Sequence, residues 1–212
     1  MTDLNATKAR IFRITHIDNL AWLLDHGLHC QNGEEKDPDF VGIGTQNLID
    51  KRQHRPVPID PGGILGDYVP FYFTPYSIMM LNIKTGYNGV VKRPNGEIII
   101  LVSSIHRLVE LDVPFVFTTG HAYLAETEYF NSIDDLERVD WALLQSRNFK
   151  RDPDDPGKQA RYQAEALVHR KMPVDALLGI ACYNAEGKKV AEEQVGQREL
   201  ALNVKVLPNW YF

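Results

Sequence analysis

Hydrophobic and polar positions follow two spacings along this chain, one typical of strands and one typical of helices. Apolar runs rich in β-branched and aromatic residues predict short strands at residues 11–15, 69–73, 97–102, 114–117, 163–168, 179–183 and 203–207. Helical spacing bounded by capping residues or glycine predicts helices at residues 19–27, 76–83, 104–111, 132–146, 174–178 and 188–200. The two kinds of element do not alternate regularly, so we predict an α+β fold.

The stretch from Arg52 to Phe73 begins as an irregular segment and ends as an aromatic strand. Its prolines and the Gly62-Gly63 pair exclude a helix over residues 56–63, because proline lacks a backbone donor and glycine admits otherwise forbidden backbone angles. Long irregular segments within a domain often carry function. We therefore expect a functional loop that leads into a buried strand.

Length and composition favour one domain over residues 1–212, since 212 residues of which 44% are hydrophobic suffice for one core. The longest apolar run, residues 98–102, is far shorter than the roughly 18 residues of a membrane helix. Residues 1–10 are polar and lack the apolar stretch of a secretion signal. We expect a cytoplasmic protein that does not contact a membrane.

Several common chemistries lack their signatures in this sequence. No glycine-rich phosphate loop, paired-histidine zinc helix, Gly-x-Ser-x-Gly elbow or Cys-x-x-Cys pair occurs. The cysteines Cys30 and Cys182 have no partner at metal-ligand spacing, so we expect buried, reduced thiols and no bound metal.

The net charge of −5 argues against a protein that coats nucleic acid, because such binding needs many Lys and Arg contacts to phosphate. An enzyme that acts on nucleic acid needs only a local basic patch beside its active site. Two clusters could supply it, and for each the alternative is an ordinary solvated charge run. The first cluster is Lys51, Arg52, His54 and Arg55, and the second is Arg147, Lys150 and Arg151.

Polar side chains share one face on two of the predicted strands. Gln163 and Glu165 alternate with apolar residues, which would present a carboxylate into a cleft from a rigid element, or to solvent from an edge strand. Arg13 and Thr15 share a face of the first strand, and His16 and Asn19 follow at the turn. Each pair is as compatible with a structural role as with a site.

Segments spread over nearly the whole chain resemble the DarT family in order and separation. They are residues 11–20, Gly27-Leu28, Lys51-Arg52, Pro61-Gly62-Gly63, residues 67–73, residues 114–118, Gln163-Ala164-Glu165 and residues 210–212. The resemblance implies an ADP-ribosyltransferase-like domain with a central mixed, split sheet flanked by helices. It also implies a toxin that uses NAD to ADP-ribosylate a base in single-stranded DNA, with a DarG-like macrodomain antitoxin as its partner.

The resemblance also implies roles for individual residues. Glu165 is the catalytic carboxylate that holds the ribose and stabilises the sugar cation, and Gln163 orients the acceptor or the ribose. Arg52 lies near the NAD phosphates and the incoming base, where a guanidinium stabilises a thymine deprotonated at N3. The remaining NAD contacts fall on Arg13 (where relatives carry His), Thr15, His16, Asn19, Gly44 and Tyr72. The DNA contacts fall on Lys51, His54, Arg55, Arg147, Lys150, Arg151 and Gln163.

Three functions stay open at this point. Thymine in single-stranded DNA is the expected acceptor, because its N3 is occupied in a base pair. A second possibility keeps NAD and changes the acceptor to guanine, RNA or protein. A third, a silent NAD-binding or DNA-binding module, is disfavoured by the presence of Glu165 and Arg52.

Overall fold

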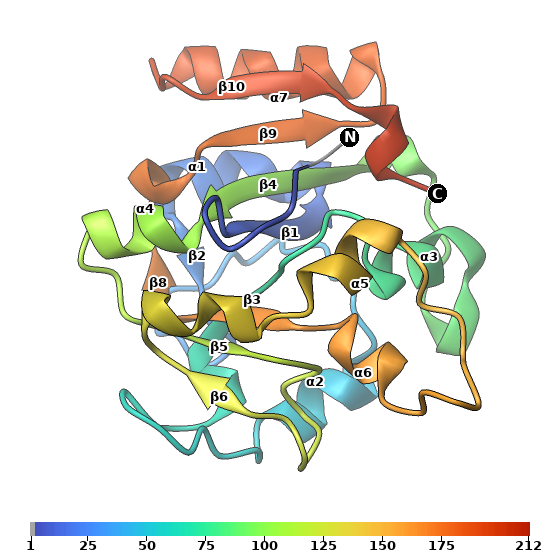
Figure 1. The fold of residues 1–212 in the computed structure, drawn as a ribbon. Coiled ribbons are helices and arrows are strands. Elements are labelled where there is room, and N and C mark those ends of the chain that lie inside the picture. Colours follow the sequence, from blue (N-terminus) through green and yellow to red (C-terminus); the bar gives the residue numbers. More distant parts are fainter. Residues whose placement is uncertain (1–2) are drawn as a thin grey trace.

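One mixed sheet of eight strands runs through residues 3–212, the part of the chain that the computed structural model describes (Figure 1). The strands lie in the order β10-β9-β4-β1-β3-β7-β5-β6. Their bounds are β1 Arg10–His16, β3 Tyr68–Tyr72, β4 Ile98–Ser104, β5 Phe115–Thr118, β6 Tyr129–Phe130, β7 Glu165–His169, β9 Gly179–Cys182 and β10 Asn203–Val206. Every predicted strand is confirmed, with shifts of a few residues at some ends.

The sheet is split between β1 and β3. The two strands share only the pair Phe12↔Tyr72, whereas β1 pairs with β4 from Arg10↔Ser104 to His16↔Ile98. On the other side, β3 pairs with β7 along its whole length. β9 and β10 are parallel and the other neighbours are antiparallel, so the predicted mixed, split sheet is confirmed.

Helices flank the sheet on both sides, as expected for the α+β class (Figure 1). The α-helices are α1 Leu20–His26, α2 Gln46–Arg52, α3 Ile78–Thr85, α4 Ile105–Glu110, α5 Trp141–Ser146, α6 Lys158–Arg161 and α7 Ala185–Gln197. The short strands β2 Leu28–His29 and β8 Lys171–Met172 form a separate small sheet. None of the helices within residues 3–212 is long and apolar enough to cross a membrane.

Local sequence signals explain several element ends. Ser77 and Ser104 cap α3 and α4 by accepting hydrogen bonds from Met80 N and Arg107 N. Gly86 ends α3 in the left-handed conformation. The irregular segment before β3 uses Gly62 and Gly63, both with φ of +78°, which few other residues adopt.

The predicted helices differ from the structure at several points. The helix expected over residues 132–146 is a 3₁₀ helix, Ile133–Arg138, followed by α5, because Asp140 accepts from Leu143 N and starts a new helix. Helix α7 begins at Ala185, where Asn184 caps it, and not at residue 188. The basic residues Lys51 and Arg52 end a helix, α2, which the sequence pattern did not predict.

Candidate active site

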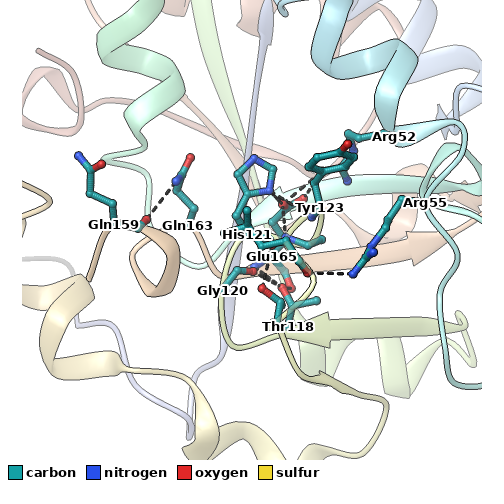
Figure 2. Close-up of polar contacts among 12 residues, drawn as sticks. Arg52, Arg55, Thr118, Gly120, His121, Tyr123, Gln159, Gln163 and Glu165 are labelled. Carbon is teal, nitrogen blue, oxygen red and sulfur yellow. Dashed lines mark hydrogen bonds and ion pairs between the residues drawn. The ribbon is translucent and has the colours of Figure 1, made fainter. Parts of the chain in front are cut away.

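Glu165 is a buried carboxylate at the start of β7, with three donors around it (Figure 2). Arg52 Nη1 lies 2.9 Å from Oε2 and 3.2 Å from Oε1. His121 Nδ1 lies 3.2 Å from Oε1, and Ala122 N donates to the same oxygen at 3.0 Å. The structure thus brings together the two residues predicted to be catalytic, Glu165 and Arg52, and adds His121 to them.

The pairing of β5 with β7 fixes the backbone around this carboxylate. The register Phe117↔Ala166 places Thr118 next to Glu165, and Glu165 N donates to Thr118 Oγ1 at 3.1 Å. Thr118 Oγ1 in turn donates to Gly120 O at 2.6 Å, which bends the chain back toward the carboxylate. His121 and Ala122 therefore reach Glu165 from the loop that follows β5.

His121 was not among the predicted site residues. Its Nδ1 lies close to both Glu165 Oε1 and, at 3.3 Å, Tyr123 N, and one nitrogen cannot donate to the first while accepting from the second. Because an ionised carboxylate is the stronger partner, we assign Nδ1–H to Glu165. The sequence did contain a signal for His121, because it lies in the loop that follows a predicted buried strand, and such loops often carry functional residues.

Burial by itself would raise the pKa of Glu165, but its donors reverse the shift. The charge of Arg52 acts most strongly, the hydrogen bonds from His121 and from the Ala122 N–H add to it, and the pKa falls to about 2 from 4.5. The carboxylate is therefore ionised at any pH at which the chain is expected to work. This is the state needed to stabilise a positive charge.

The lowered pKa makes acid stability depend on Glu165. A depressed pKa contributes stability above the unfolded value of 4.5, and that stability is lost as pH falls toward the folded value of about 2. We expect the wild type to lose more unfolding free energy than Glu165→Gln between pH 5 and pH 2, by on the order of 3 kcal/mol. Urea unfolding at a series of pH values measures this, and parallel pH curves for the two proteins would contradict it.

The family described as "ssDNA thymidine ADP-ribosyltransferase, DarT" matches residues 12–212 of this chain. The chain belongs to the DarT family. A curated relative from Escherichia coli O127:H6 (strain E2348/69 / EPEC), named DNA ADP-ribosyl transferase, is 49% identical over 209 residues, which cover 99% of this chain and 96% of the relative. The chain is therefore an enzyme of the DNA ADP-ribosyl transferase class.

Solved DarT structures share the fold throughout. The structure of Thermus sp. 2.9 DarT in complex with ADP-ribosylated ssDNA superposes with a TM-score of 0.90 at 30% identity and covers 100% of both chains. Its complex with NAD⁺ superposes with a TM-score of 0.83 at 31% identity and covers 97% of this chain and 98% of that one. The α+β architecture of this chain is thus the DarT architecture.

Of the predicted NAD contacts, Tyr72 lies beside Glu165, and Arg13 lies near Tyr72 and Arg52. Tyr72 pairs directly with Glu165 across β3 and β7, and burial, followed by the Glu165 charge, raises its pKa to about 12. Arg13 Nη1 donates to Pro70 O at 2.8 Å, across the split of the sheet. Burial lowers the pKa of Arg13 to about 10, which leaves it a cation at neutral pH.

Other predicted NAD contacts have protein partners in this structure. His16 accepts from Asp18 N and lies 3.4 Å from Glu97 Oε2. Thr15 and Asn19 are buried and bonded to each other, with Asn19 Nδ2 at 3.0 Å from Thr15 Oγ1. Gly44 lies exposed in the segment before α2.

The prediction that Gln163 and Glu165 share a strand face is wrong. Strand β7 begins only at Glu165, and residues 158–163 continue as a helix and turn, with Gln163 N donating to Ala160 O. The side chain of Gln163 donates to Gln159 O at 3.0 Å and points away from Glu165 (Figure 2).

The predicted DNA contacts fall into two groups. Lys51, His54, Lys150 and Arg151 are exposed and remain candidates for phosphate contacts. Arg55 and Arg147 are engaged with the protein: Arg55 Nη2 donates to Leu124 O at 3.0 Å, and Arg147 lies 4.5 Å over the Tyr76 ring. Arg55 therefore ties the irregular segment before β3 to the loop that carries His121, and its expected role as a DNA contact stays a prediction.

Proposed function

We propose that this DarT-family enzyme transfers ADP-ribose from NAD to N3 of thymine in single-stranded DNA and releases nicotinamide. The observation that carries the proposal is an ionised, buried Glu165 held against the guanidinium of Arg52. A carboxylate in this state is suited to the positive charge that develops on a ribose carbon as nicotinamide leaves.

The residues present fit NAD as the donor substrate. Arg52 Nη2 is buried and has no hydrogen-bond partner within residues 3–212, although its neighbour Nη1 is bonded to Glu165. A buried donor without a partner costs free energy, so a substrate oxygen that accepts from it is favoured. A phosphate oxygen of NAD or a carbonyl oxygen of the base meets this need.

Transfer to thymine requires a balanced exchange of bonds at N3. The N3–C1′ bond forms, the bond from C1′ to nicotinamide breaks, and the N3 proton is removed. Arg52 remains a cation and stabilises the N3 anion without accepting that proton. The N3 proton passes to Nε2 of His121, which can accept it because the other ring nitrogen, Nδ1–H, is directed to Glu165.

Membership of the DarT family supports two further parts of the proposal. The enzyme acts as a toxin, since modification of bases in single-stranded DNA blocks pairing at the modified position. Its partner is a DarG-like macrodomain antitoxin. The exposed Lys51 and His54, next to Arg52, supply basic contacts for the phosphates of a single strand.

The acceptor is tested by intact mass of oligonucleotides incubated with NAD. We expect a thymine-containing single strand to gain one ADP-ribose, and the same strand annealed to its complement to be protected. A strand methylated at thymine N3 should stay unmodified, because that atom then has no proton to lose. A matched strand with every thymine replaced by cytosine is the control, and a guanine-only strand tests the other base.

Equal modification of duplex and single strand would contradict protection by pairing, and would mean either an acceptor atom outside the pairing edge or efficient flipping of the base out of the duplex. Modification of the thymine-free, guanine-containing strand would move the acceptor to guanine. An unmodified set of strands, with NAD consumed in the presence of RNA or protein, would move it outside DNA.

A further inference from the structure

Asn19 follows β1 and uses its whole side-chain amide to hold the segment that precedes α2. Its Oδ1 accepts from Val41 N at 2.8 Å, and its Nδ2 donates to Val41 O at 3.0 Å. The second hydrogen of Nδ2 is directed to Thr15 Oγ1, also at 3.0 Å. The amide therefore pairs with Val41 in both directions, as a neighbouring strand would.

We propose that Asn19 is a positioning residue for ADP-ribose transfer, which acts by fixing residues 38–45 and, through α2, the place of Arg52 beside Glu165. The inference rests on the function proposed above, in which Arg52 contacts the substrates. Asn19 itself is only 1% exposed and its amide donors are both used by protein groups, so it has no donor left for a substrate.

Helix α2 depends on its ends because it has no fully buried apolar anchor of its own. Within Gln46–Arg52, which the structure describes in full, the apolar side chains of Leu48 and Ile49 are only partly buried. A helix without a buried face gains little from packing, and a short helix is marginal by itself. The position of α2 must therefore be set by the segments on either side.

The two ends of α2 are held differently. At the C-terminal end, Arg52 pairs with Glu165, and Leu65 N donates to Arg55 O at 2.9 Å. The N-terminal end of α2 is preceded by residues 38–45. Among the described residues, every hydrogen bond from this segment to a residue outside 37–49 goes to Asn19. Ile43 adds one partly buried apolar contact. Loss of Asn19 thus frees one end of the helix that delivers Arg52.

The test combines amide hydrogen exchange with transfer kinetics on the full chain. In Asn19→Ala we expect the Val41 amide to exchange about tenfold faster or more, because its acceptor is gone. We expect kcat for transfer to single-stranded DNA to fall about tenfold with a smaller change in KM for NAD, since a misplaced group costs rate even when substrate still binds.

A matched control separates positioning from general loss of stability. Asn95 is also a buried asparagine whose Nδ2 donates to a backbone carbonyl, that of Phe212, at 2.8 Å. Asn95→Ala should lower the melting temperature while leaving Val41 exchange and kcat at wild-type values. If Asn19→Ala does not fold, Thr15→Val removes one of the three bonds and should shift exchange and kcat in the same direction by a smaller factor.

Each outcome decides a separate part of the inference. Wild-type exchange at Val41 in Asn19→Ala would overturn the pairing, and faster exchange with unchanged kcat would overturn its role in transfer. A wild-type chain that is inert with NAD and single-stranded DNA would overturn the proposed function. Amide hydrogen exchange at Val41 would still test its pairing with Asn19.

Discussion

Glu165→Gln is expected to reduce ADP-ribose transfer by about 10²-fold or more while the chain stays folded and still binds NAD. The amide keeps the shape of the side chain, and its oxygen still accepts from Ala122 N, but it carries no charge to set against the developing sugar cation. Single-turnover transfer to a thymine-containing strand, followed by mass spectrometry, measures the rate. Calorimetry with NAD measures binding separately.

The choice of glutamine matters because Glu165 is a buried partner of a cation. Glu165→Ala would leave the Arg52 guanidinium, only 13% exposed, with neither charge nor acceptor at this side chain, whereas the glutamine oxygen can still accept from it. Breaking a buried pair in this way costs about 3–5 kcal/mol of stability, so inactivity of the alanine variant would have two explanations. Glu126→Gln, an exposed glutamate in the loop that carries His121, is the matched control and should retain wild-type rate. Wild-type rate in Glu165→Gln itself would remove Glu165 from the mechanism.

The strands and their order along the chain were predictable, whereas the partners of Glu165 were not. Strand residues such as Ile98–Leu101 bury apolar side chains in a local pattern that the sequence displays directly. The contacts of Glu165 with Arg52 and His121 join segments far apart in sequence, and they depend on strand register. Arg52 was assigned from the resemblance to DarT proteins, and His121 had no such guide.

The errors at Gln163 and Asp140 have the same physical origin, namely that a local pattern does not reveal how backbone groups are satisfied, and the missed helix α2 has another. Gln163 fits strand alternation with Glu165. Its backbone N–H nevertheless donates to Ala160 O in the turn that follows α6, and its side-chain amide donates to Gln159 O. Helix α2 escaped prediction because a helix without a buried face leaves no apolar period. Asp140 fits a helix interior by composition, but its carboxylate caps Leu143 N and divides the predicted helix in two.

Arg52→Lys is expected to lower kcat about 10²-fold, although the positive charge beside Glu165 is kept. Lysine can pair with the carboxylate through Nζ, so the fold and the ionised state of Glu165 should persist. It lacks the second donor of the planar guanidinium, and Nη2 is the buried donor that has no partner within residues 3–212. The loss of rate should therefore appear in kcat, measured with NAD and DNA both at saturating concentration.

Lys51→Ala is the control for Arg52→Lys, because Lys51 is exposed and one residue earlier on α2. It should raise KM for DNA and leave kcat within about threefold of wild type. The slope of log binding constant against log salt concentration should fall in magnitude by about one, as expected for one lost phosphate contact. The two variants thus distinguish a donor used in the transition state from a charge used in binding. Arg52→Lys could instead behave like Lys51→Ala, with kcat preserved and only DNA affinity reduced. In that case the unpaired Nη2 is not used in transfer, and Arg52 serves only as part of the basic surface that holds the strand.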